Sequence, residues 1–119
     1  MGVIHRLERI LVALERRVGY VGDLITTGRR SGRPHSVTVG FVRDRDETLL
    51  IAAQRPDGAW AANLGSDPRC EFTVRGRTGR YVARQLSGTE QEAAIRRIRR
   101  RYAGDARYGT GPAFRLRPD

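Results

Sequence analysis

Residues 24–42 read LITTGRRSGRPHSVTVGFV, and this stretch decides the fold class. In its second half, Val37, Val39 and Phe41 alternate with small or polar residues, which is the two-residue period of a strand with one buried face. Its first half holds a shorter strand at residues 24–27. Because a basic segment bracketed by glycines joins the two strands, the stretch predicts a β-hairpin with a basic turn.

Further strand and helix patterns follow the hairpin. A polar turn at residues 44–47 leads to the apolar run TLLIAA, which predicts a buried third strand in a three-strand meander. Thr89 and Glu92 match a capping box, in which the threonine side chain satisfies a free amide at the start of a helix. The other predicted elements are a short helix at 59–64, a hairpin with strands 69–75 and 80–86 around a turn at 76–79, a helix from 89 and a final strand at 113–116.

An amphipathic helix is predicted at residues 2–18, where apolar residues recur at helical spacing. Its basic face also fits peripheral contact with a membrane, although the same pattern describes any surface helix. Two hairpins and few crossovers favour a mostly antiparallel sheet that closes on itself, with helices packed outside. At 119 residues, we expect one domain, 1–119, that is mainly β with flanking helices (α+β).

The composition indicates a basic protein. Arginine and lysine number 23 against 13 acidic residues, and the net charge of +10 attracts polyanions such as nucleic acid, anionic lipid or a phosphorylated cofactor. No apolar run could span a bilayer and no signal peptide is recognisable, so we expect a cytoplasmic location. The single cysteine, Cys70, cannot form an internal disulfide, and zinc and hydrolase motifs are missing, so we expect no metal.

The basic turn combines glycines, hydroxyl groups and three arginines within a few residues. Glycine lets backbone amides approach an anion, hydroxyl groups donate to phosphate oxygens, and guanidinium groups neutralise the charge. An ordinary polar hairpin turn has the same composition. The spacing of the residues does not distinguish such a turn from a phosphate-binding one. The phosphate interpretation assigns cofactor binding to Thr27, Gly28, Arg29, Arg30, Ser31, Gly32 and Arg33.

Two motifs together resemble a known family. The turn reads Thr-Gly-Arg-Arg-Ser-Gly, and residues 60–68 read WAANLGSDP, a Trp-x-x-Asn-Leu-x-x-x-Pro pattern. In this order the motifs resemble those of the deazaflavin-dependent nitroreductases, and the similarity runs from Leu24 to near the C-terminus. The resemblance implies a split β-barrel of about six mostly antiparallel strands, similar to FMN-binding barrels.

The resemblance also implies a cofactor and a reaction. The cofactor would be coenzyme F-420, an 8-hydroxy-5-deazaflavin with a phosphodiester and a polyglutamate tail, with FMN as the alternative. Its reduced form would pass a hydride to a quinone, a nitro compound or an activated double bond. The ring would lie near Ala53, Gln54 and Arg55, where the family usually has Ala-Ser-Lys. Trp60 and Asn63 complete the predicted cofactor site, although Trp60 also suits a hydrophobic anchor and Asn63 a brace for the turn.

Some family members use tyrosines after the last long helix to wall the substrate pocket and donate a proton. Tyr102 and Tyr108 lie in that region and are the candidate catalytic residues, since reduction of a quinone needs an acid beside the hydride donor. Tyr102 also continues an apolar stripe with Ile98, which favours a core position as the alternative. His35 could touch a phosphate, although a surface histidine on a strand is the simpler interpretation.

Other functions stay open at this point. One is a protein that binds a flavin or deazaflavin without turnover, or that prefers FMN. Another is a basic nucleic-acid-binding barrel, which would need exposed aromatic residues among the basic ones, whereas the few aromatics here mostly fall at core positions. We therefore expect the protein to bind a small-molecule substrate and no nucleic acid. We expect it to be a monomer or a homodimer.

Overall fold

The computed structural model describes residues 20–55, 58–102 and 111–119. The helix predicted at residues 2–18 lies outside these ranges. The described strands are β1 (Val21–Thr27), β2 (Pro34–Gly40), β3 (Val42–Arg43), β4 (Leu49–Ala52), β5 (Arg69–Val74), β6 (Arg77–Gln85) and β7 (Ala113–Pro118). The described helical segments are the short 3-10 helix η1 (Arg45–Glu47), α2 (Ala59–Ser66) and α3 (Gly88–Arg101).

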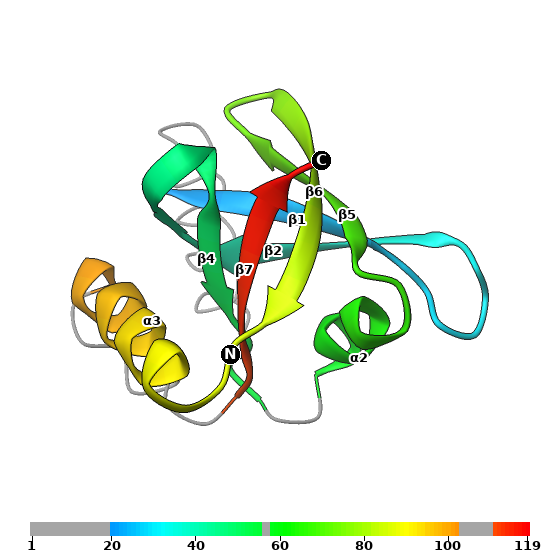
Figure 1. Ribbon diagram of the computed structural model, residues 1–119. Coiled ribbons are helices and arrows are strands. Elements are labelled where there is room, and N and C mark those ends of the chain that lie inside the picture. Colours follow the sequence, from blue (N-terminus) through cyan, green and yellow to red (C-terminus); the bar gives the residue numbers. More distant parts are fainter. Residues whose placement is uncertain (1–19, 56–57, 103–110) are drawn as a thin grey trace, which may run out of the picture.

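The described strands form one sheet in the order β2-β1-β5-β6-β7-β4-β3, and each neighbouring pair is antiparallel. Figure 1 shows this sheet curled, with β1 and β2 crossing β4 and β7. A core that includes Leu24, Phe41, Phe72 and Leu116 fills the curl. The predicted mainly β, mostly antiparallel barrel is therefore confirmed, and the two-residue β3 is the addition to the six strands expected.

Cys70 belongs to the same core. Its side chain is buried on β5, and burial raises the pKa of the thiol to about 12. A thiol with so high a pKa is not a nucleophile at neutral pH. Cys70 is therefore a small apolar filler of the barrel interior.

Strand β4 is buried as predicted, but its partners differ from the prediction. The three-strand meander is wrong, because β4 pairs with β3 and β7 and has no ladder with β2. Leu49 and Ile51 face the core inside the curl, whereas Leu50 and Ala52 belong to a second core under α3. A strand covered on both faces needs a continuous apolar run, and such a run does not say which strands lie beside it.

The turn of the second hairpin lies earlier than predicted. The register pairs Val74 with Arg77, so the connection is Arg75-Gly76 and not residues 76–79. Both connecting residues have positive φ, at 52° for Arg75 and 77° for Gly76. This is the geometry of a two-residue turn that matches the right-handed twist of the two strands, and β6 consequently begins at Arg77.

Helix α3 also begins differently from the prediction. It starts at Gly88 after the N-cap Ser87, and no side-chain capping bond is present at that end, so the capping box at Thr89 is wrong. Ala94 and Ile98 point toward β4 and form the second core. In Figure 1, α3 packs on the outside of the sheet near β4, and α2 lies on the other side of the sheet.

Candidate functional site

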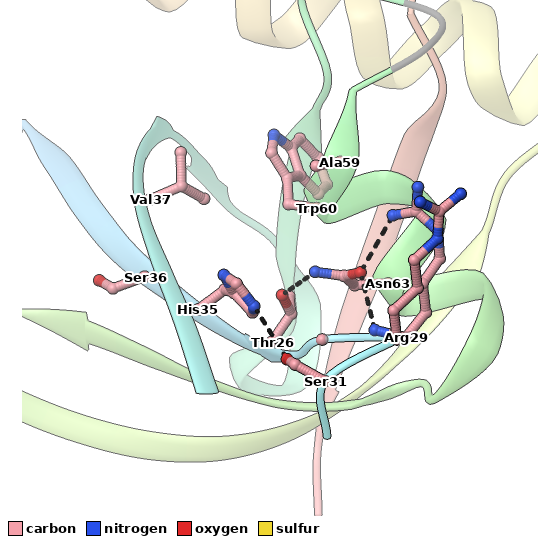
Figure 2. Close-up of a pocket in the computed structure, with 11 residues that line it drawn as sticks. Thr26, Arg29, Ser31, His35, Ser36, Val37, Ala59, Trp60 and Asn63 are labelled. Carbon is pink, nitrogen blue, oxygen red and sulfur yellow. Dashed lines mark hydrogen bonds between the residues drawn. The ribbon is translucent and has the colours of Figure 1, made fainter. Parts of the chain in front are cut away.

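A cavity of about 560 Å³ lies between the β1–β2 hairpin and helix α2. Figure 2 shows its lining, with polar side chains on one side and the Trp60 ring with Val37 on another. Its volume falls within the range of small-molecule and cofactor sites, which is roughly 300–1,000 Å³. The lining residues are Thr26, Gly28, Arg29, Arg30, Ser31, His35, Ser36, Val37, Ala59, Trp60 and Asn63.

Asn63 on α2 is the centre of a buried hydrogen-bond network. Its Oδ1 accepts from the backbone amide of Arg29 at 3.1 Å and from the Arg29 guanidinium at 3.3 Å. Its Nδ2 donates to Thr26 Oγ1 at 3.1 Å, and the two side chains are 4% and 2% exposed. Since a buried amide is costly when unpaired, these three bonds fix the position of the turn relative to α2.

Internal hydrogen bonds already use most backbone amides of the turn. Gly28 N donates to Arg33 O at 2.8 Å, and Gly32 N donates to Gly28 O at 2.9 Å. Arg33 N donates to Ser31 Oγ at 3.2 Å. The amides of Arg30 and Ser31 have no partner among the described residues, so they are the two amides of the turn that can donate to a ligand.

Ser31 and His35 meet directly above Gly28. Ser31 Oγ and His35 Nε2 are 3.3 Å apart, and both side chains are exposed. A Cβ atom on Gly28 would lie 2.6 Å from each of these two atoms. A side chain at position 28 would therefore require the Ser31–His35 pair to shift, while Gly32, at a φ of 69°, needs glycine for its backbone conformation.

The apolar wall of the cavity comes from Trp60, Val37 and Ala59. Trp60 is half-buried, and its ring lies 5.6 Å from the ring of Phe114 in the core. One side of the indole is thus anchored in the barrel while the residue still lines the cavity. A rigid aromatic wall of this kind suits a planar ring.

The charged side chains that line the cavity are all positive. Arg29 and Arg30 line it, and none of its described lining residues is acidic. Guanidinium groups, free amides and a hydroxyl group at one end, with an aromatic wall at the other, fit a ligand that joins a phosphate to a planar ring. The phosphorylated deazaflavin expected from the sequence has both parts.

Comparison with known proteins gives the family. The sequence model of the F420H(2)-dependent quinone reductases matches residues 15–114. The chain belongs to this family. It is a deazaflavin-dependent oxidoreductase, and coenzyme F-420 is its cofactor.

Several solved structures have the same fold. A structure described as an F420-H2 dependent reductase is 21% identical, with a TM-score of 0.70 over 82% of this chain and 93% of that chain. Another, described as an F420 reductase, is 18% identical, with a TM-score of 0.67 over 90% and 91%. A third, described as a domain-swapped dimer, is 21% identical, with a TM-score of 0.69 over 97% and 96%. No curated protein matches.

The structure brings together one half of the cofactor residues predicted for this reductase. Six of them line the cavity, namely Gly28, Arg29, Arg30, Ser31, Trp60 and Asn63. The other six do not line it, namely Thr27, Gly32, Arg33, Ala53, Gln54 and Arg55. Ala53 is fully buried and its amide donates to Pro112 O, whereas Gln54 and Arg55 are exposed after the end of β4.

The two candidate catalytic tyrosines have different outcomes. Tyr108 lies outside the described residues. The Tyr102 hydroxyl accepts from Phe41 N at 2.8 Å and donates to the Tyr20 carbonyl at 2.7 Å, so it ties the end of α3 to the start of β1 and to the segment after β2. Tyr102 does not line the cavity of this reductase.

Sequence reasoning left out several lining residues. Thr26 was recognisable, because the two-residue period counted from the core residue Leu24 places Thr26 on the inner face and Thr27 on the outer one. His35 was considered as a possible phosphate contact, with a surface histidine as the simpler interpretation, and it lines the cavity. Ser36 and Val37 carried no such signal, since their place in the lining depends on how α2 docks against the hairpin. Within the described residues, no cluster could hold a metal ion, and no helix combines the length and apolar content needed to cross a membrane.

Proposed function

We propose that this reductase transfers a hydride from reduced coenzyme F-420 to a quinone, and that the cavity beside α2 binds the cofactor with its phosphate against the turn. The observation that supports this cofactor position is that buried Asn63 holds Arg29 by two hydrogen bonds, one from the backbone amide and one from the guanidinium group. It holds a guanidinium group beside a cavity whose described lining has no carboxylate. A preorganised cation of this kind binds an anion without first having to be ordered.

Each part of the cavity has a role in binding. Arg29 and Arg30 neutralise the phosphate, and the amides of Arg30 and Ser31 donate to its oxygens. Trp60 and Val37 cover the planar part of the cofactor and exclude water from it. Asn63 acts through Arg29 and Thr26, and it is therefore a positioning residue.

When bound, reduced F-420 supplies the hydride, and the protein contributes binding, orientation and a proton. We keep Tyr108 as the proposed proton donor, because reduction of a quinone consumes a proton as well as a hydride. The substitution Tyr108→Phe should then lower kcat with menadione and leave the affinity for F-420 unchanged. An unchanged kcat would remove Tyr108 from the mechanism.

Binding and turnover need separate measurements. Calorimetric titration with F-420 and with FMN should give the tighter complex with F-420. Oxidation of reduced F-420 should then be followed with menadione, a nitroaromatic compound and an activated enone, and we expect the highest kcat/KM with menadione. Binding without turnover of any acceptor would contradict the reductase proposal, and tighter binding of FMN would favour the flavin alternative.

Assembly and location are finer proposals. One similar structure is described as a domain-swapped dimer, and we propose that this chain is a monomer or a homodimer. Light scattering coupled to size-exclusion chromatography decides between them. Cytoplasmic location, and peripheral membrane contact through residues 2–18, are tested by cell fractionation and by vesicle sedimentation.

A further inference from the structure

Thr26 is both deeply buried and part of the cavity lining. It lies on β1, opposite His35 on β2 and Cys70 on β5, and it is 2% exposed. It nevertheless lines the cavity beside α2, together with Arg29 and Arg30, which are exposed. Thr26 is therefore a polar residue on the buried side of the cavity, whereas the arginines lie on its exposed side.

Arg29 fixes the direction of the hydrogen bond between Thr26 and Asn63. The two groups that Arg29 presents to Asn63 are its backbone amide at 3.1 Å and its guanidinium group at 3.3 Å, and both can only donate. The atom that they contact must be Oδ1 of Asn63, so Nδ2 is the atom that faces Thr26. Because Nδ2 can only donate, Thr26 Oγ1 accepts this bond at 3.1 Å (Figure 2).

This bond leaves the hydroxyl hydrogen of Thr26 for another partner. A threonine hydroxyl group has one hydrogen and two lone pairs, and Asn63 occupies one of the lone pairs. Among the described residues, no acceptor lies within hydrogen-bond distance of that hydrogen. A buried donor without an acceptor is costly, so an occupant of the cavity has to supply one. A ligand with an apolar group or a donor at this position would leave the cost in place.

The burial of Thr26 indicates which part of a ligand it contacts. Guanidinium groups and free amides of the exposed turn suit a charged phosphate. A single hydroxyl group on the buried side suits a neutral oxygen, such as that of a carbonyl or hydroxyl group. Trp60 and Val37 line the same cavity and favour a planar, uncharged ligand part there.

We propose that Thr26 is a specificity-determining residue of the cofactor site, whose hydroxyl group donates a hydrogen bond to a neutral oxygen in the phosphate-free part of the cofactor. The identity of that cofactor as F-420 at this cavity rests on the proposed function. Asn63, oriented by Arg29, keeps Thr26 in the donor role. A site built to donate to an oxygen discriminates against an analogue that lacks it.

The test uses two probes in calorimetric titrations, 8-hydroxy-5-deazariboflavin, which lacks the phosphate, and inorganic phosphate. Thr26→Val keeps the shape of the side chain and removes the hydroxyl group. Affinity for the deazariboflavin should fall about five- to tenfold, the size of one neutral hydrogen bond, and affinity for phosphate should stay as in wild type.

The other outcomes of this comparison contradict the inference. An equal loss with both probes would mean that the substitution acts by releasing Asn63 and Arg29. A loss with phosphate alone would place the contact at the charged end of the cofactor. Unchanged affinity for both probes would mean that the Thr26 hydroxyl group makes no contact with the ligand.

Control variants separate the hydroxyl group from the rest of the side chain. Thr26→Ser keeps the hydroxyl group, and Thr27→Val removes one from the next residue, which does not line this cavity. Both should bind the deazariboflavin as wild type does, and a loss in either that equals the loss in Thr26→Val overturns the inference. If Thr26→Val does not fold, Thr26→Ala replaces it, because its smaller side chain leaves room for a water molecule on Nδ2 of Asn63.

Titration with F-420 itself separates this inference from the cofactor assignment. A loss in Thr26→Val by the same factor as with the deazariboflavin supports the inference. If F-420 binds equally well to wild type and to Thr26→Val, the inference fails and the proposed function stands. If wild type binds neither F-420 nor the deazariboflavin, the proposed function fails and the inference fails with it.

Discussion

In the part of the reductase that the structure describes, arginines cluster on helix α3 and in the turn between β1 and β2, and the two clusters have different partners. On α3, Arg97 donates to Asp44 Oδ1 at 2.9 Å and to the Arg43 carbonyl at 3.0 Å. Arg101 lies over the rings of Tyr20 and Phe41, at 5.4 Å from each ring centre. These cations therefore serve the packing of the helix on the barrel.

In the turn, the positive charge faces a cavity. Arg29 is held by the neutral side chain of Asn63, and Arg30 lines the same space, where the described lining offers no acidic partner. The number of arginines therefore does not locate a binding site. An anion-binding site is expected where the fold holds a cation in place and provides no acidic side chain to neutralise it.

The largest effect is expected when charge is removed from the arginines between β1 and β2 and, as a control, from those on α3. The double substitution Arg29→Ala and Arg30→Ala should weaken F-420 binding about 100-fold, because it removes two charge-assisted contacts to phosphate. The matched control is Arg96→Ala with Arg100→Ala, two exposed positions on α3, which should change the affinity less than about twofold. Calorimetric titration measures both, and equal losses would contradict the comparison.

The next test removes the support of the turn. Asn63→Ala leaves Thr26 and the Arg29 amide without their buried partner, so the free energy of unfolding should fall by about 2 kcal/mol. Binding of F-420 should weaken as well, since Arg29 is no longer held. Urea unfolding and calorimetry check the two effects, with Ser66→Ala at the exposed end of α2 as a control. Full stability in Asn63→Ala would show that the network does not hold the turn.

A smaller effect is expected on the α3 side from Tyr102→Phe. The Phe41 amide and the Tyr20 carbonyl lose their shared partner, which should cost about 1–2 kcal/mol of the free energy of unfolding. Affinity for F-420 and kcat should stay as in wild type. A lower kcat at unchanged stability would instead support the catalytic role that the sequence suggested for Tyr102.

The smallest effect concerns Asp44, the carboxylate that pairs with Arg115 and Arg97. Hydrogen bonds from Arg115 first, and also from Arg97, lower the pKa of Asp44 from 3.8 to about 2. Because the folded pKa lies below the unfolded one, this stabilisation is complete above about pH 5 and is lost as the pH falls toward 2.

The expected loss by about pH 3 is about 1 kcal/mol. Urea unfolding of wild type and of Asp44→Asn at about pH 5 and about pH 3 measures it, and the difference between the two proteins should shrink by that amount. A difference that stays constant between the two pH values would show that the pKa of Asp44 is not lowered in the folded protein. Binding of F-420 at about pH 5 should be unaffected by Asp44→Asn, which separates this cluster from the turn.

Local patterns predicted most of the elements. The two-residue alternation in residues 24–42 correctly indicated β1 and β2, and an uninterrupted apolar run correctly indicated the buried strand β4. The turn at Arg75-Gly76 was misplaced, since several nearby glycines satisfy the same composition and the register across β5 and β6 decides among them. Pairing of β4 with β7 joins segments about 60 residues apart, and no local pattern encodes such a partner.

Some residues of the candidate site could be predicted from local sequence and others could not. Gly28, Arg29, Arg30 and Ser31 were found because they lie together in the chain. Asn63 was found through the resemblance, and its bonds to Arg29 and Thr26 show the physical link between the two motifs. Arg33 shares the charge and the turn of its neighbours but does not line the cavity.

By itself, the sequence determined that this protein is mainly β with a basic, glycine-bracketed turn, because periodicity, glycine conformation and charge act over a few residues. Only the tertiary structure decided which cations lie beside a cavity without an acidic partner and which histidine faces that cavity. These properties depend on burial and on partners brought together from distant parts of the chain. The free energy that holds a side chain in place comes from such contacts, and spacing along the sequence does not record them.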